Sequence, residues 1–127
     1  MPIPIYLDYN ATTPIDPAAV AAMLPWLGEH FGNPSSEHVY GRRAAQAVAG
    51  AREEVAGLIG APTGSLHFTG CATEANNLAL IGAARALRER GRHLIISAVE
   101  HPAVIGPAER LRADGWAVTV LPVDEYA

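Results

Sequence analysis

The fold is predicted by the stretch SLHFTGCATEANNLALIGAARALRERGRHLIISA, residues 65–98. A short β-prone segment, 65–69, runs into a turn of small residues, 70–74. The alanine- and leucine-rich run that follows is typical of a helix ending near Arg90. The apolar run 93–98 is typical of a strand that is buried on both faces. Strand, helix and strand in this order favour a parallel pair of strands joined by a crossover helix.

The same alternation continues downstream. Residues 104–113 predict a helix that Gly106 and Pro107 break near its start, and residues 116–123 (WAVTVLPV) predict a third strand. We therefore predict an α/β fold, with a mostly parallel sheet and flanking helices. Three strands leave this sheet incomplete, with an unpaired edge that a larger sheet would cover.

The first sixty residues predict two helices and two loops. One helix begins at Asp16, an N-cap residue followed by proline, and ends at Gly28. A second helix covers 42–59 and closes at Gly60. The loop 31–41 (FGNPSSEHVYG) between them is rich in Gly, Pro, Asn and Ser, and it carries two aromatic residues and a histidine.

The composition excludes several classes of protein. A net charge of −4 without a basic tract argues against a nucleic-acid partner. No apolar stretch approaches the roughly 18 residues of a membrane span, and no signal peptide is recognisable. The single cysteine, Cys71, forms no intrachain disulfide and suits a reducing compartment, so we expect a cytoplasmic protein. No Cys/His cluster has metal-ligand spacing, so no metal site is expected.

Ligands of open α/β sheets bind at the carboxyl ends of the strands. The first such end is the turn 70–74, whose small side chains would let an anion approach the amides at the start of the next helix. Thr73 adds a hydroxyl donor. The alternative is that Thr69 or Thr73 caps the helix and Gly70 only serves a tight turn.

The second strand end carries Glu100 and His101. His101 could stack on a planar ligand, act as an acid or base, or cap a helix whose first residue is Pro102. Two neighbouring strand ends with polar groups favour a single ligand pocket.

Two further residues have a functional and a structural interpretation. His38 either lines a pocket or belongs to a surface loop that satisfies its own polar groups. Cys71 is either a nucleophile at a helix N-terminus or a small residue filling a tight turn, and we favour the second interpretation.

Four motifs carry a resemblance to a known family: YLDYNATTP (6–14), FGNPSSEH (31–38), TGCATEANNLA (69–79) and EHPAV (100–104). In sequence and order they resemble the cysteine desulfurases, which belong to the class V aminotransferase group of fold-type I pyridoxal-phosphate (PLP) enzymes. The resemblance covers essentially the whole chain. It implies that 1–15 is an N-terminal extended arm and active-site loop, and that 16–127 is the N-terminal half of the PLP-binding large domain.

The resemblance also implies roles for individual residues. Ala72 and Thr73 would hold the PLP phosphate, and His101 would stack on the pyridine ring and carry a proton as the catalytic residue. The implied cofactor-binding set is Gly70, Cys71, Ala72, Thr73, Glu74 and His101, and the implied substrate-adjacent set is Asn10, Ala11, Thr12 and His38. One departure is that Gly70 and Cys71 stand where the family has Ser and Gly. If the family's glycine has a positive φ, Cys71 would be strained there.

The family's Schiff-base lysine has no counterpart here, because all nine cationic residues are arginines. The ring-holding aspartate and glutamine and the sulfur-accepting cysteine of the family also lie beyond the matched motifs. The resemblance therefore implies a split or truncated desulfurase that is not active alone and is completed by a second polypeptide, with a dimer partner as a further expectation. The implied reaction converts L-cysteine to L-alanine and passes persulfide sulfur to an acceptor protein of iron–sulfur or thiolation pathways. The alternatives are a non-catalytic module that pairs with a full-length desulfurase, or part of a selenocysteine lyase or another C–S lyase.

Overall fold

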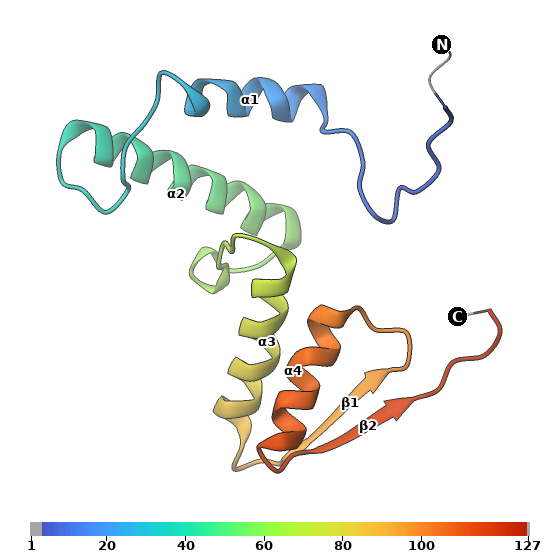
Figure 1. The fold of residues 1–127 in the computed structure, drawn as a ribbon. Coiled ribbons are helices and arrows are strands. Elements are labelled where there is room, and N and C mark those ends of the chain that lie inside the picture. Colours follow the sequence, from blue (N-terminus) through green and yellow to red (C-terminus); the bar gives the residue numbers. More distant parts are fainter. Residues whose placement is uncertain (1–3, 127) are drawn as a thin grey trace. The chain divides into compact units, whose positions relative to one another are not determined.

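The computed structural model describes residues 4–126 and shows the predicted α/β architecture (Figure 1). The chain divides into two units, Met1–Leu66 and His67–Ala127. The first unit holds helices α1 (Pro17–Leu27) and α2 (Val39–Ile59) and the short 3₁₀ helix η1 (Thr63–Ser65). The second unit holds α3 (Ala72–Leu87), β1 (His93–Ser97), α4 (Pro102–Ala113) and β2 (Ala117–Leu121).

The second unit contains a parallel strand pair with a helical crossover. β1 and β2 pair in parallel, with His93 opposite Ala117 at one end and Ser97 opposite Leu121 at the other. α4 connects the two strands and contacts both of them, and α3 lies beside α4 (Figure 1). The parallel pairing predicted for 93–98 and 116–123 is therefore confirmed.

The strand predicted at 65–69 is wrong. Thr63–Ser65 forms the 3₁₀ turn η1, and Leu66 has extended backbone angles, φ −95° and ψ 129°, without belonging to a strand. An apolar extended segment becomes a strand only by hydrogen bonding to a neighbour. Within residues 4–126, no strand pairs with the segment 65–69. The sheet of the described chain therefore has two strands, β1 and β2.

The core of the second unit is built mostly from alanine. Ala108 is fully buried on α4, and Ala103, Leu111, Ala84 of α3 and Ile96 of β1 are buried with it. Ile95, on the opposite side of β1, remains 56% exposed. The prediction that 93–98 is buried on both faces is therefore wrong. In the described chain, helical contacts to β1 come from α4 alone, and successive side chains of a strand point to opposite faces.

Helix α4 also differs from the prediction. It starts at Pro102 instead of residue 104 and continues through Gly106 and Pro107. Pro102 takes the first helical position, where its missing N–H is not needed. Pro107 removes one hydrogen bond inside the helix, but it is buried next to Ala108, and this packing holds the helix together across it.

In the first unit, both predicted helices form. Asp16 caps α1 through a 2.7 Å bond from the Ala18 amide to its carboxylate, as predicted. α2 begins at Val39, three residues before the predicted start, and ends at Ile59. Gly60 follows it with φ 65°, as expected of a closing glycine. The earlier start arises because His38, within the predicted loop, caps the helix.

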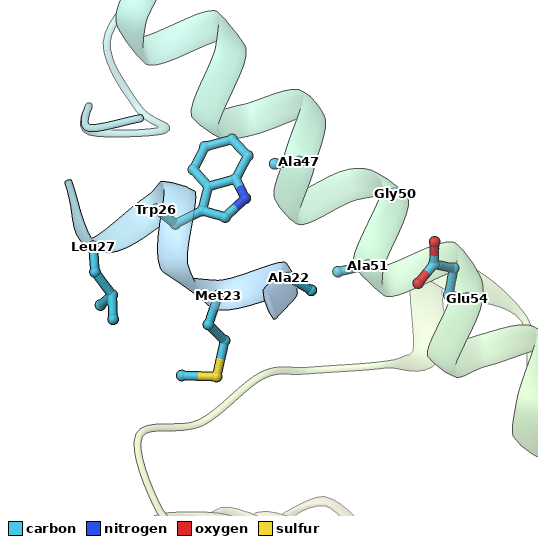
Figure 2. A pocket seen from close by; sticks show the side chains of 8 residues that line it. All are labelled: Ala22, Met23, Trp26, Leu27, Ala47, Gly50, Ala51 and Glu54. Carbon is cyan, nitrogen blue, oxygen red and sulfur yellow. The ribbon is translucent and has the colours of Figure 1, made fainter. Parts of the chain in front are cut away.

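A groove of about 610 Å³ lies between α1 and α2 (Figure 2). The large side chains Met23, Trp26 and Leu27 of α1 line one wall. Small residues of α2, with Glu54 at the end of the row, line the other wall: Ala47, Gly50 and Ala51. Every helix in the described residues is too short or too polar to span a bilayer.

Gly41, in the first turn of α2, is required by close packing. A Cβ at this position would lie 2.1 Å from the Ser36 carbonyl oxygen and 2.7 Å from that of Asn33. We expect Gly41→Ala to lower the free energy of unfolding by about 2 kcal/mol, because backbone atoms of the 33–36 turn must move. Gly50→Ala in the same helix is the matched control. It meets no atom within 4 Å and should raise stability by about 0.5–1 kcal/mol. Urea unfolding followed by circular dichroism measures both, and equal stabilisation by the two variants would contradict the packing argument.

Candidate functional site

Two helix N-termini meet at one groove of the second unit. The groove has a volume of about 400 Å³ and is lined by residues of α3 and α4. These two helices lie side by side (Figure 1). Thr73 at the start of α3 and His101 at the start of α4 both line the groove. The remaining lining residues are Asn77, Ile81, Pro102, Ala103, Gly106, Pro107 and Arg110. The residues singled out at the two strand ends, Thr73 and His101, thus lie at one groove.

The first turn of α3 has no side-chain cap. Cys71 is the N-cap residue, and its side chain accepts no hydrogen bond from the turn. The hydroxyl of Thr69 donates to the Cys71 carbonyl at 3.2 Å, so the alternative in which Thr69 or Thr73 caps this helix is wrong. The other three α-helices of the described chain are capped by side chains, from Asp16, His38 and His101. The leading amides of α3 therefore remain available to an anion, at the positive end of the helix dipole.

The turn before α3 is held by Glu74. Its Oε2 accepts a 2.8 Å hydrogen bond from the Gly70 amide, so the third residue of the helix reaches back to the preceding turn. This arrangement resembles a capping box that is shifted by one residue. A Cβ at Gly70 would lie 3.3 Å from the same Oε2. Gly70 and Glu74 are thus tied to each other and fix the shape of the turn.

Cys71 is accommodated without strain. Its φ is −165° and its ψ is 167°, an extended conformation open to any residue. Glycines alone have positive φ in the described part of the chain. The strain expected for Cys71 in place of the family's glycine is therefore absent. The thiol is exposed.

His101 caps α4. Its Nδ1 accepts a 3.0 Å hydrogen bond from the Ala103 amide, and Pro102 occupies the first helical position. The capping alternative raised from the sequence is therefore confirmed. Because Nδ1 acts as an acceptor, the neutral ring carries its proton on Nε2. The cap fixes the orientation of an exposed ring at the groove, and the role of that ring towards a ligand stays a prediction.

The predicted substrate-adjacent residues lie in the first unit. Asn10, Ala11 and Thr12 belong to a turn in which the amides of Ala11 and Thr12 donate to the Asp8 carbonyl, at 3.2 and 3.4 Å. The Tyr6 hydroxyl donates to the carbonyls of Asp8 and Thr12 and closes this turn. The structure gives the local shape of this segment, and its role towards substrate stays a prediction.

His38 has structural partners of its own. Its Nδ1 accepts from the Gly41 amide at 3.3 Å and caps α2. Its ring lies edge-on to Tyr40, with 6.2 Å between ring centroids, and Tyr40 stacks on Phe31 at 5.1 Å. Of the two interpretations of His38, the local structure agrees with a loop that satisfies its own polar groups.

Asn77 lies at the groove and was missed from the sequence. Its side-chain nitrogen donates a 2.8 Å hydrogen bond to the Thr73 carbonyl, one turn earlier in α3. The signal was the four-residue spacing of 73, 77 and 81, which places these residues on one helix face.

Arg110 also lines the groove, and it pairs with Asp114 at 3.2 Å. No group of three or more His, Cys, Asp or Glu side chains in residues 4–126 could hold a metal ion.

The sequence pattern of the family described as aminotransferase class-V matches residues 5–127. The chain belongs to this family. Its curated relatives include the cysteine desulfurase IscS 1 of Archaeoglobus fulgidus, with 47% identity over 95% of the chain and 32% of the relative. The IscS of Methylococcus capsulatus is 48% identical over 95% of the chain and 30% of that protein. The chain therefore spans about a third of the length of these relatives.

Solved structures share the fold. A NifS-like protein superposes with a TM-score of 0.87 and 36% identity, over 96% of this chain and 34% of that chain. A structure of SspA in complex with cysteine gives a TM-score of 0.81 and 39% identity, over 91% and 33%. The resemblance to the cysteine desulfurases and the α/β fold class are thus confirmed. Class V aminotransferases and cysteine desulfurases are PLP-dependent enzymes, so the predicted cofactor is confirmed as that of the family.

The cap of α4 can be tested apart from any ligand. We expect His101→Ala to lower the free energy of unfolding by about 1 kcal/mol, because the Ala103 amide loses its acceptor. His101→Asn should be nearly neutral, since asparagine is a good N-cap residue. Urea unfolding of both variants measures the difference. If His101→Ala and His101→Asn lower the free energy of unfolding equally, the cap does not contribute to stability.

Proposed function

We propose that this chain forms the part of a cysteine desulfurase that holds the phosphate and the ring of PLP. The observation that carries the proposal is the uncapped N-terminus of α3, with Thr73 and His101 lining one groove. The desulfurase names of the relatives support this choice of reaction.

The residues present fit the phosphate group of PLP. Amides at a helix N-terminus bind phosphate oxygens, and the helix dipole favours a negative charge there. Ala72 and Thr73 would hold the phosphate through their amides, and the Thr73 hydroxyl would add a donor. Gly70, Cys71 and Glu74 would keep the turn in shape around it, as the bond from the Gly70 amide to Glu74 suggests.

His101 would lie against the cofactor ring and transfer a proton. Its Nδ1 already accepts from the Ala103 amide, so Nε2 is the atom that would exchange a proton with the reacting groups. When bound, PLP supplies an electron sink for breaking bonds at the substrate carbons. Asn10, Ala11, Thr12 and His38 would lie near the substrate, L-cysteine.

The proposed reaction breaks the C–S bond of L-cysteine, leaves L-alanine, and transfers the sulfur to a protein thiol as a persulfide. Two groups that it needs are not among these 127 residues. The sequence has no lysine, and its one cysteine lies in the turn at the phosphate end of the site. We propose that a second polypeptide, or a further part of the same protein, supplies the lysine and the sulfur-accepting cysteine.

The exposed surfaces of the second unit support a larger assembly. Strands β1 and β2 pair only with each other within residues 4–126, and Ile95 and Leu121 are more than half exposed. Unpaired strand edges and large exposed apolar side chains are features that a partner covers. The proposed assembly would be cytoplasmic, would include a dimer partner, and would pass sulfur to an acceptor protein for iron–sulfur clusters or thiolation.

Reconstitution tests this function. The chain is co-expressed with the polypeptide proposed to complete it, and the purified complex is assayed for PLP absorbance and cysteine-dependent sulfide release. Activity in the complex, and none with either part alone, is the expected result. A stable complex that binds no PLP would contradict the proposal.

The phosphate site makes a separate prediction for the chain itself. We expect Thr73→Val to weaken the binding of PLP about tenfold, since a hydroxyl donor to a charged group is lost. Pyridoxal, which lacks the phosphate, should bind the variant as well as it binds the wild type. Thr63→Val, the same chemical change at a residue that does not line the groove, should leave both affinities unchanged. Equilibrium dialysis measures them, and an equal loss for PLP and pyridoxal would argue against a phosphate contact at Thr73.

A further inference from the structure

Two backbone carbonyls at the start of α3, those of Cys71 and Thr73, accept hydrogen bonds. The amide nitrogen of Ala75 donates to the Cys71 carbonyl at 3.1 Å, as the first hydrogen bond of the helix. The side-chain nitrogen of Asn77 donates to the Thr73 carbonyl at 2.8 Å. A carbonyl oxygen only accepts hydrogen bonds, so the nitrogen of the Asn77 amide must be the atom that faces it.

The bond from Asn77 to the Thr73 carbonyl can stabilise the first turn of α3 without using its amides, which an anion site at a helix N-terminus requires. A side-chain cap would steady the first turn, but it would also occupy amides that the anion needs. Without a cap, the leading residues of a helix are those most prone to fray. A side chain that binds a carbonyl of the same turn steadies it and leaves the amides open.

Asn77 meets that requirement. It is partly buried, it lines the groove beside Thr73, and its bond is made to a residue of the open turn. Asparagine is a poorer helix former than alanine, so helix stability alone does not favour it at this position. Asn76, the preceding residue, makes no side-chain hydrogen bond within residues 4–126 and does not line the groove.

We propose that Asn77 is a positioning residue for the phosphate site. It acts through the Thr73 carbonyl and holds the Thr73 amide and hydroxyl in the direction that an anion needs. This inference rests on the proposed function, because it assumes that the start of α3 binds the phosphate of PLP.

The test compares the affinities of the full chain for PLP and for pyridoxal, whose ratio isolates the phosphate. We expect Asn77→Ala to reduce this ratio about fivefold, the effect of losing one hydrogen bond that orders the site. The melting temperature should change little, because the higher helix propensity of alanine offsets the lost hydrogen bond. Asn76→Ala is the matched control, and it should keep the ratio of the wild type.

A second substitution tests whether the loss of the hydrogen bond, and not a change in side-chain size, causes the effect of Asn77→Ala. Asn77→Asp keeps the size of the side chain but cannot donate to the Thr73 carbonyl, and Asn76→Asp places the same charge one residue away. The ratio should fall further for Asn77→Asp than for Asn76→Asp. The ³¹P resonance of PLP bound to the variants of residue 77 should also move towards its position in free PLP.

The outcomes separate the inference from the proposed function. If the wild type prefers PLP to pyridoxal and both variants of residue 77 keep that preference, the role of Asn77 is wrong and the phosphate site stands. If the wild type shows no preference for PLP, the phosphate site and the role of Asn77 both fail.

Discussion

Backbone amides at the start of a helix have no partner inside the helix, and the candidate site in this chain depends on how that need is met at α3. A side chain caps each of the other three α-helices in the described chain, whereas Cys71 at the start of α3 caps nothing. Uncapped amides are costly unless water or a ligand binds them. The turn is instead kept in place by Glu74 on the Gly70 amide and by Asn77 on the Thr73 carbonyl. These two hydrogen bonds thus stabilise the turn and leave its leading amides without a side-chain partner.

The position of this turn depends on close helix packing. α3 and α4 run side by side, and the buried residues between and beneath them are mostly alanines, with Ala84, Ala103 and Ala108 among them. Small side chains let two helices approach closely, and this brings the start of α3 and the start of α4 to one groove. A larger residue at Ala108, which is fully buried, would separate the helices and with them Thr73 from His101.

The sequence predicted those features that depend on local chemistry. The caps at Asp16 and Gly60 and the parallel pair from 93–98 and 116–123 follow from residues close together in the chain. Anion binding at the turn 70–74 stays a prediction. The strand expected at 65–69 was wrong because a strand needs a partner, which the segment's own residues do not reveal. Asn77 was missed for a related reason. A single asparagine on a helix gains meaning only when its bond to the Thr73 carbonyl is seen.

His101 illustrates how alternatives drawn from a sequence can be compatible. Stacking on a ligand, proton transfer and helix capping were raised as separate interpretations of one residue, but an imidazole ring has two nitrogens and two faces. The cap on the Ala103 amide uses Nδ1 alone, so Nε2 keeps the proton of the neutral ring and both faces of the ring stay outside the cap. The cap also fixes the ring relative to α4, and a fixed ring loses less conformational freedom when a planar cofactor settles against it. Capping is therefore the structural condition that would make His101 an effective partner for a cofactor ring.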